Sequence, residues 1–207
     1  MEPKKSTRGA SERDEWLRAA WRVLLALALD ARRLVFVDEM GSNIALAPLY
    51  AYAPKGERAY SKVPRNRGKN ITLLASMTFD KGMGECMLIE GSTTAAVFES
   101  YVENFLVPML KEGQVVILDN LKAHKGDRVR QLIEGRGCEL VFLPAYSPDL
   151  NPIEEAFSKI KGILREVGAR SQEALLEAIA EAISMVTAQD AKVFFEHCGY
   201  HLVGQHL

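Results

Sequence analysis

Two short apolar runs, each followed by an aspartate, constrain the fold of this chain more than any other feature. Residues 34–37 read Leu-Val-Phe-Val before Asp38, and residues 115–118 read Val-Val-Ile-Leu before Asp119. Four consecutive apolar residues rich in β-branched types indicate strands that are buried on both faces. Ligands of open α/β sheets bind in the crevice at the strand ends. The two carboxylates are therefore candidates for one site, although either alone more often opens a loop or caps a helix.

The remaining periodicity predicts a mixed α/β fold. Further strands are expected at residues 44–52, 71–79, 85–90 and 138–143, and Pro48 in the first of these indicates an edge position or a bulge. Helices are expected at residues 12–29, 93–111, 125–135, 152–167, from Ser171 onward, and near residues 191–198. The order predicts an antiparallel start to the sheet and parallel strands later.

Length and composition exclude several classes of protein. The chain has 207 residues and a net charge of −1, enough for one catalytic domain at residues 31–200, with a tail and linker helix at 1–30 and a C-terminal tail at 201–207. Three widely spaced cysteines argue against a disulfide framework and for a cytoplasmic setting. The apolar run at residues 23–29 is too short to span a membrane, and the polar start is not a signal peptide.

The stretch at residues 143–157, LPAYSPDLNPIEEAF, uses rigid turn chemistry to begin a helix with two adjacent glutamates. Asn151 is a natural N-cap, so Glu154 at the third helical position is open to a capping-box role. The helix also has an apolar stripe, and Glu154 lies at about 90° from its centre whereas Glu155 lies at about 170°. If one glutamate takes part in chemistry, it is Glu154.

Three converging carboxylates repel one another unless a cation lies between them. A set of oxygen ligands favours a hard ion, Mg²⁺ or Mn²⁺. Asp38, Asp119 and Glu154 are therefore candidate ligands for a divalent metal, and two such ions can assist an in-line phosphoryl transfer.

Three segments together resemble the DDE transposases of bacterial insertion sequences related to the Tc and mariner elements. They are VFVDE at residues 35–39, ILDNLKAHK at 117–125, and LPAYSPDLNPIEEAF at 143–157. Thirty-four residues separate Asp119 from Glu154 (154 − 119 − 1 = 34), a spacing typical of that superfamily. The resemblance extends from about Leu34 to Tyr200, and Phe157 stands where the family often has Trp.

The resemblance implies a ribonuclease-H-like mixed sheet flanked by helices, with Asp38, Asp119 and Glu154 as the catalytic and metal-binding triad. It also implies strand cleavage by water, transfer of the freed 3′-hydroxyl to target DNA, Mg²⁺ or Mn²⁺, a homodimer on DNA, and a bacterial, nucleoid-associated protein. Too few residues precede Asp38 for the family's helix-turn-helix domains. We therefore expect the catalytic domain alone, either a second reading frame or a truncated copy.

Candidate DNA contacts lie in two places. Residues 53–70 carry six cations and one acid, Glu57, which gives +5; the cations are Lys55, Arg58, Lys62, Arg65, Arg67 and Lys69. This run is a candidate phosphate-contacting strip beside the active site, although most charge runs are solvated loops. After Asp119, Asn120, Lys122, His124 and Lys125 are candidates for orienting a phosphate, and His124 is open to a helix-capping role instead.

Two alternatives to a transposase share the same motifs. One is a metal-dependent nuclease that cuts DNA without joining it. The other is a non-catalytic, truncated transposase that regulates by binding DNA. Near the C-terminus, His197, Cys198, His201 and His206 superficially suggest zinc, but their spacing is irregular and this region resembles an ordinary helix end of the family.

Overall fold

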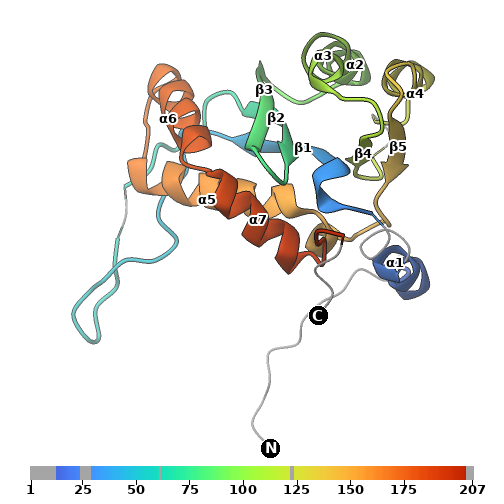
Figure 1. The fold of residues 1–207 in the computed structure, drawn as a ribbon. Helices are drawn as coiled ribbons and strands as arrows, with labels where there is room; N and C mark the ends of the chain where they lie inside the picture. The colour runs from blue at the N-terminus through green and yellow to red at the C-terminus, as the bar shows by residue number, and fades with distance from the viewer. Residues whose placement is uncertain (1–12, 24–28, 61, 122–123, 204–207) are drawn as a thin grey trace, which may run out of the picture.

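The computed structural model describes residues 13–23, 29–60, 62–121 and 124–203, and its centre is one five-stranded sheet (Figure 1). The strand order is β3-β2-β1-β4-β5, with bounds Gly82–Glu90, Ile71–Thr78, Leu34–Ser42, Val115–Leu118 and Glu139–Phe142. β1, β2 and β3 pair antiparallel, whereas β4 runs parallel to β1 and β5 parallel to β4. The predicted antiparallel start and parallel continuation are therefore confirmed.

Helices cover both faces of the sheet (Figure 1). One layer contains α5 (Pro152–Val167), α6 (Gln172–Ser184) and α7 (Ala188–His197). The other contains α2 (Ala95–Tyr101), the π-helical turn η3 (Val102–Leu106), α3 (Val107–Met109) and α4 (Asp127–Glu134). The short helix α1 (Glu15–Trp21) lies on the side of α5 and α7, and the 3₁₀ turns η2 (Ala31–Arg33) and η5 (Pro148–Leu150) precede β1 and α5.

Side chains of β1 and β4 contribute to two separate hydrophobic cores, one on each face of the sheet. All four residues of the apolar run in β1, and all four of β4, are buried. Side chains alternate between the faces of a strand, so half of them join each core. Leu34, Phe36, Val115 and Ile117 pack with α5, α6 and α7, whereas Val35, Val37, Val116 and Leu118 pack with α2 and α4. This two-sided burial is what the uninterrupted apolar runs predict.

The same alternation decides where the two aspartates point. Asp38 continues the series of Leu34 and Phe36, and Asp119 continues that of Val115 and Ile117, so both face the α5 layer. Val37 pairs in register with Leu118. The next step along both strands places Asp38 and Asp119 side by side, about 5 Å apart between backbones.

Local capping agrees with most predicted helix boundaries. The Thr94 hydroxyl accepts a hydrogen bond from the Val97 amide at 3.3 Å, and the Ser171 hydroxyl accepts one from the Ala174 amide at 3.2 Å. Gly168 ends α5 at φ = +61°, a left-handed conformation that glycine adopts without a steric penalty. Within the described ranges, no helix combines the length and the apolar character needed to cross a bilayer.

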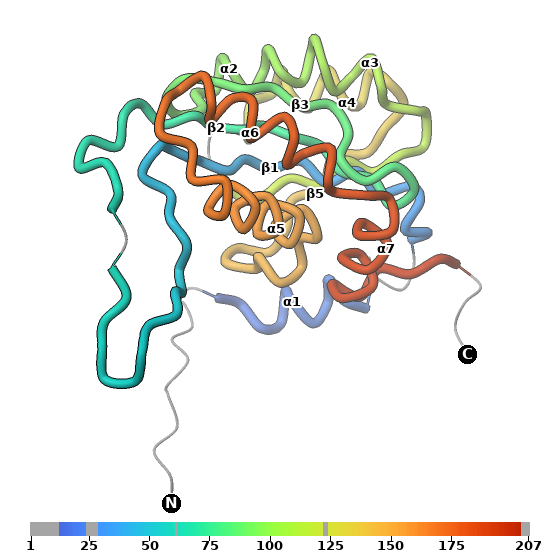
Figure 2. The backbone as a smooth tube through the Cα atoms, turned by 90° about the vertical axis from the view of Figure 1, so that its left-hand side faces the viewer, coloured from blue at the N-terminus to red at the C-terminus, as the bar shows by residue number. Residues whose placement is uncertain are grey.

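Two sequence predictions are wrong or only partly met. Residues 44–52 form no strand, because β1 is already paired on both sides and Arg170 donates to the carbonyls of Ile44 and Leu46 at 3.0 and 2.8 Å. Residues 43–70 instead form a long arm that extends away from the body (Figure 2). Of the predicted helix at 12–29, α1 covers residues 15–21, Leu29 is not helical, and residues 24–28 lie outside the described ranges.

Two neighbouring leucines of α6 test this packing. Leu175 is 1% exposed in the core, whereas Leu176 is 38% exposed. We expect Leu175→Ala to lower the free energy of unfolding by about 2–5 kcal/mol, because it removes buried methyl groups and leaves a cavity. Leu176→Ala is the matched control and should cost less than about 1 kcal/mol. Urea unfolding measures both, and equal effects would contradict the assigned face of α6.

Candidate active site

A cavity of about 580 Å³ opens at the carboxyl end of β4 and beside the middle of β1, which continues four residues beyond Asp38. Asp38 reaches it from β1, Asp119 from the end of β4, and Glu154 from the first turn of α5. The cavity is also lined by Glu39, Asn120, Leu121, the loop residues 143–148 and Asn151. The structure therefore brings together, around one space, the three acids that lie far apart in the sequence.

Asp38 is the most deeply placed of the three acids, at 6% exposure. Its Oδ1 accepts a hydrogen bond from the Glu39 amide at 2.7 Å, and its Oδ2 accepts one from the Asn151 side-chain amide at 2.8 Å. Both oxygens are thus oriented by neighbours on two different elements. This holds the carboxyl in one position at the wall of the cavity.

Asn151 has a role that sequence analysis missed. The Asn-Pro step suggested an N-cap, but the Asn151 side chain makes no capping hydrogen bond with α5 and donates to Asp38 instead. The Asn151 Oδ1 atom is buried without a hydrogen-bond partner among the described residues. Its backbone carbonyl still accepts from the Glu154 amide at 3.1 Å, which begins the helix. A buried asparagine before a helix was the available signal, but only the tertiary contact identifies its partner.

His124 orients the second acid. Its Nδ1 lies 2.6 Å from Asp119 Oδ1, which also accepts from the Leu121 amide at 3.1 Å. The imidazole is fully buried, stacks on the Phe98 ring at 4.0 Å between centroids, and has its Nε2 3.6 Å from Glu39 Oε2. Burial acts to lower the pKa of His124, but the hydrogen bonds and charges of Asp119 and Glu39 outweigh it and raise that pKa to about 9.

The cavity disfavours negative charge in the absence of a counter-ion. Burial raises the pKa of Asp38 to about 7; the Glu39 amide opposes this, and the charges of Glu154 and Asp119 add to it. Burial also raises the pKa of Glu154, where Lys161 opposes and Asp119 reinforces the effect. Acids that repel one another in this way bind a cation or retain protons.

The stripe geometry is met for Glu154 but not for Glu155, which was expected opposite the stripe and is instead half-buried beside α7. Glu154 lines the cavity, whereas the Glu155 carboxylate lies 3.1 Å from His197 Nδ1 on α7. The capping-box alternative for Glu154 is not observed, since no side-chain capping bond is present at this end of α5. Glu154 is therefore the glutamate available to act with the two aspartates.

The donor set of this cavity fits a hard divalent ion. Its acidic side chains and the unpartnered Asn151 Oδ1 are all oxygen donors, the ligand type that Mg²⁺ and Mn²⁺ prefer. Across the described ranges, no three His, Cys, Asp or Glu side chains, the three acids of this cavity included, are grouped closely enough to hold a metal ion as they stand. An open cavity with few protein ligands suits ions that keep water and substrate oxygens in their coordination sphere.

Tyr146 stands at the rim of the cavity with unusual backbone geometry. Among the described residues other than glycine, it alone has a positive φ, +55°, and its side chain is 57% exposed. Sequence analysis assigned Tyr146 only to a turn. The structure adds an accessible aromatic ring beside the acids, the kind of surface on which a nucleic-acid base can stack.

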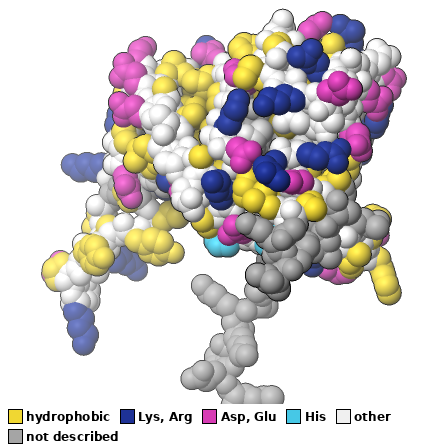
Figure 3. Space-filling view, in the orientation of Figure 1, with side chains coloured by type: hydrophobic (Ala, Val, Ile, Leu, Met, Phe, Trp, Pro, Cys, Tyr) yellow, Lys and Arg dark blue, Asp and Glu magenta, His cyan; other side chains and the backbone are white. Residues whose placement is uncertain are grey.

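The predicted DNA contacts are divided between two places. Asn120 lines the acidic cavity, and Lys125 places its ammonium 5.8 Å from the centre of the Phe142 ring. Lys122 lies outside the described residues. The six cations of the 53–70 run lie on the arm, away from the acids, and the arm exposes hydrophobic as well as basic side chains (Figure 3). Lys69 pairs with Glu90 at the base of the arm.

The C-terminal histidines and cysteine do not form a metal site among the described residues. His197 faces Glu155, and Cys198 is buried with a free thiol. His206 lies outside the described ranges.

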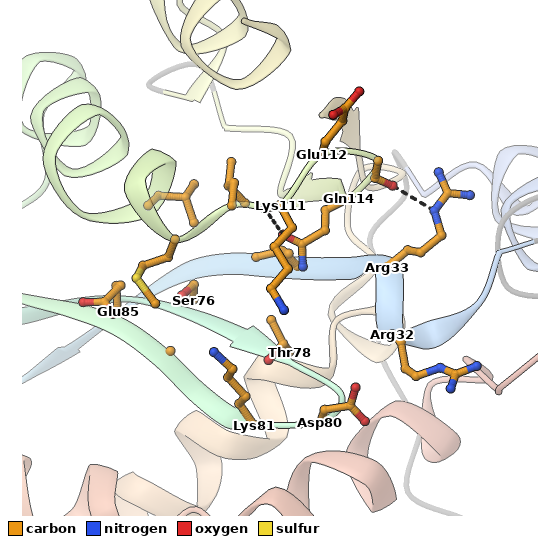
Figure 4. Close-up of a pocket in the computed structure, with 16 residues that line it drawn as sticks. Arg32, Arg33, Ser76, Thr78, Asp80, Lys81, Glu85, Lys111, Glu112 and Gln114 are labelled. Atoms are coloured by element: carbon orange, nitrogen blue, oxygen red, sulfur yellow. Dashed lines mark hydrogen bonds between the residues drawn. The ribbon is translucent and has the colours of Figure 1, made fainter. Parts of the chain in front are cut away.

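A second cavity, of about 390 Å³, lies at the opposite end of β1 (Figure 4). Lys81 and Lys111 point into it above an apolar wall, and Arg33 bonds the Gly113 carbonyl at 2.8 Å. Its carboxylates alternate with these cations instead of converging from strand ends. The convergent acids therefore belong to the first cavity and not to this one.

The pKa of His124 makes a prediction about stability in metal-free buffer. A folded-state pKa of about 9, above the ordinary 6.5, gives stabilisation that is complete below pH 6.5 and disappears as pH rises through 9. His124→Gln should therefore lower the free energy of unfolding by up to about 3 kcal/mol more near pH 6 than near pH 9.5. Urea unfolding of both proteins in EDTA measures the difference in their free energies of unfolding. A difference that does not depend on pH would contradict a raised pKa of His124.

Comparison with known proteins agrees with the fold and the motifs. The family model described as DDE superfamily endonuclease matches residues 33–176. The Tcb1 transposase of Caenorhabditis briggsae is 32% identical over 117 residues, which cover 53% of this chain and 43% of that protein. The chain thus spans less than half of this relative, and a nematode relative gives no support to the expected bacterial source.

Solved structures of the Mos1 mariner transposase share the fold. The paired end complex with Mn matches with a TM-score of 0.78 at 21% identity, over 96% of this chain and 64% of that one. The Mos1 catalytic domain matches with a TM-score of 0.62 at 19% identity, over 89% and 84%. The expected ribonuclease-H-like fold is confirmed by these matches. Because the family model covers most of its length, this chain belongs to the DDE superfamily endonucleases.

Proposed function

We propose that this chain is the catalytic domain of a DNA transposase of the Tc–mariner type. The observation that supports this most strongly is the convergence of Asp38, Asp119 and Glu154 on one cavity in a chain of the DDE family. The Tcb1 relative is named as a transposase, and the Mos1 neighbours include a strand transfer complex. Since the chain spans only part of these proteins, the complete transposition activity is a proposal for this chain.

The proposed reaction has two phosphoryl transfers. Water attacks the scissile phosphorus, the bond to the 3′ oxygen breaks, and the strand ends in a free 3′-hydroxyl. That hydroxyl then attacks a phosphorus of the target DNA and displaces the target's own 3′ oxygen. Each step replaces one P–O bond by another, so neither requires an external energy source.

The three acids would hold Mg²⁺ or Mn²⁺, and we propose two ions. When bound, these ions activate the attacking oxygen and neutralise charge on the leaving oxygen. The Mos1 structures with Mn and with Mg support the choice of metal. The pKa of Asp38, raised to about 7, means that cation binding near neutral pH should release a proton from this carboxyl group.

The surrounding residues have orienting roles. The Glu39 amide and Asn151 fix the two oxygens of Asp38, and His124 fixes one oxygen of Asp119. Because a catalytic group displaced by about 1 Å can lower a rate about 100-fold, these interactions matter for activity. Tyr146 at the rim is placed to stack on a base of the bound DNA.

DNA is the proposed partner, as transposon ends and target, and a homodimer is the proposed assembly. The Mos1 neighbours are described as a transpososome and as paired end complexes, which supports both. The cationic arm and Asn120, Lys122 and Lys125 are the proposed contacts with phosphate. His124, expected from the sequence to be another, is fully buried and bonds Asp119 instead.

A nuclease without strand transfer would use the same three acids. A non-catalytic regulator would bind DNA but would not need them to be retained and oriented as they are. Supplying labelled duplex ends with a free 3′-hydroxyl together with plasmid target separates these functions, because only a transposase joins the two molecules.

The two adjacent glutamates provide a matched test of the active site. We expect Glu154→Gln to lower the rate of Mn²⁺-dependent plasmid nicking by about 100-fold or more, since a developing charge is no longer stabilised. Glu155→Gln, in the same helical turn but directed at His197 and not at the cavity, should change that rate by less than about threefold. Circular dichroism and urea unfolding establish that both variants fold.

Two outcomes would overturn the proposal. Equal nicking by the Glu154→Gln variant and the wild type would show that the triad is not catalytic. Efficient nicking with no joining of 3′-hydroxyl ends, tested with randomised duplex ends, would favour the nuclease.

The arm makes a separate prediction about DNA affinity. Replacing Lys55, Arg58, Arg65 and Arg67 together by Gln should weaken DNA binding and reduce the slope of log K against log salt. For duplex DNA, the slope falls by about 0.9 for every phosphate that the protein no longer neutralises. Fluorescence anisotropy across a salt series measures it. Replacing Arg128 and Arg130, which are paired with Glu103 and Glu134, is the control, and an unchanged slope in the arm variant would contradict the assignment.

A further inference from the structure

A buried arginine joins helix α1 to the loop before α5. Arg18 is fully buried, and its guanidinium forms two hydrogen bonds with Asp149, Nη1 to Oδ1 at 3.0 Å and Nη2 to Oδ2 at 2.5 Å. Burying an arginine is costly unless the charge is paired and its hydrogen bonds are satisfied. The forked geometry satisfies both conditions and fixes orientation as well as distance.

A second connection runs in parallel with the first. Trp21, one turn further along α1, donates from its indole Nε1 to the Tyr200 hydroxyl at 2.8 Å. The Tyr200 hydroxyl in turn donates to the Leu150 carbonyl at 2.7 Å. Tyr200 is fully buried, and its ring packs on Phe36 of β1 at 5.1 Å between centroids. We call Arg18, Trp21, Asp149 and Tyr200 the α1 clamp.

The loop residues that the α1 clamp contacts, Asp149 and Leu150, immediately precede Asn151, which lines the acidic cavity. The side-chain amide of Asn151 orients Asp38 at 2.8 Å. Glu154 follows three residues later, in the first turn of α5. Three consecutive residues, 149–151, therefore contact α1, Tyr200 and Asp38 in turn.

Two further arginines that flank the helix reach the same carboxylate from more exposed positions, Arg22 at 3.4 Å and Arg13 at 3.8 Å from Asp149 Oδ2. Helix α1 contains seven residues, and an isolated helix of that length is unstable in water. Trp16 and Leu17 are exposed, whereas Arg18 and Trp21 are the buried residues of the helix. The side chains that bury α1 are thus the same ones that contact the loop before the triad glutamate.

We propose that the α1 clamp is a positioning device for the proposed active site. Arg18 and Trp21 hold residues 149–151 so that Asn151 and Glu154 keep their places around Asp38. The inference rests on the proposed function, and it assigns to α1, a helix outside the three motifs, control over the geometry of the triad. Arg18, Trp21 and Tyr200 are positioning residues that act through Asn151 and Glu154, since none of them lines the acidic cavity.

Two variants test the clamp without leaving an unpaired charge in the interior. Arg18→Met keeps a long apolar side chain in the buried position, and Asp149, whose side chain is 46% exposed, remains hydrated. Tyr200→Phe keeps the ring but removes the hydroxyl that joins Trp21 to Leu150. The matched control is Ile133→Val in α4, which trims the core on the other face of the sheet.

The measurements separate positioning from a general loss of stability. At a temperature where every variant is folded, we expect Arg18→Met with Tyr200→Phe to lower the nicking rate at saturating DNA by about 10- to 100-fold. The half-saturating DNA concentration should change by less than about threefold. Mn²⁺ affinity, measured by electron paramagnetic resonance without DNA, should weaken about 10-fold or more, as for other outer contacts of metal ligands. Ile133→Val should leave all three quantities within about twofold.

The outcomes distinguish failure of the clamp from failure of the proposed function. Wild-type activity and Mn²⁺ affinity in the double variant would overturn the clamp. So would an equal decrease in Ile133→Val, because the effect would then follow from stability alone. If the wild type cuts no DNA, the proposed function fails, and the change in Mn²⁺ affinity decides on the clamp by itself.

Discussion

The parallel pairing of β1 with β4 is the constraint on which the rest of this structure depends. Its recorded register ends at Val37 and Leu118, and the residues that follow this last pair are Asp38 and Asp119, which both line the cavity. Two carboxyl groups brought together by backbone pairing cannot move apart without breaking the centre of the sheet. The burial of Asp38, which raises its pKa to about 7, and the smaller contribution of the Asp119 charge to that rise therefore follow from the fold.

Hydrogen-bond donors around the cavity compensate in part for the proximity of the two aspartates, whereas Glu154 adds a further negative charge. The Glu39 amide, Asn151 and His124 each supply a hydrogen bond to one of the two aspartates. Glu154 completes the acidic lining from α5. Buried carboxylates that repel one another are stabilised when a cation binds between them. Acids in such an arrangement are therefore more typical of a metal-binding site than of a structural role.

Sequence analysis predicted most of the architecture because long periodic signals have few alternative explanations. The helix at residues 152–167 and the caps at Thr94 and Ser171 were recognisable from local chemistry alone. Residues 44–52 were misassigned because an apolar run with β-formers satisfies the local criteria for a strand. Whether such a run joins a sheet depends on a free edge in register, which is a property of the assembled fold.

For the candidate site, too, local features were predictable from the sequence and contacts between distant residues were not. The sequence by itself determined that the apolar runs of β1 and β4 are buried on both faces, that an aspartate follows each run, and that Glu154 flanks the apolar stripe of α5. These are consequences of side-chain periodicity, which is local. The sequence did not determine that β1 continues past Asp38 to Ser42. Only the tertiary structure decided that Asn151 bonds Asp38, that His124 bonds Asp119, and that Arg18 reaches Asp149 across the molecule. Such interactions join residues up to 131 positions apart, and no local preference encodes which buried polar group will meet which partner.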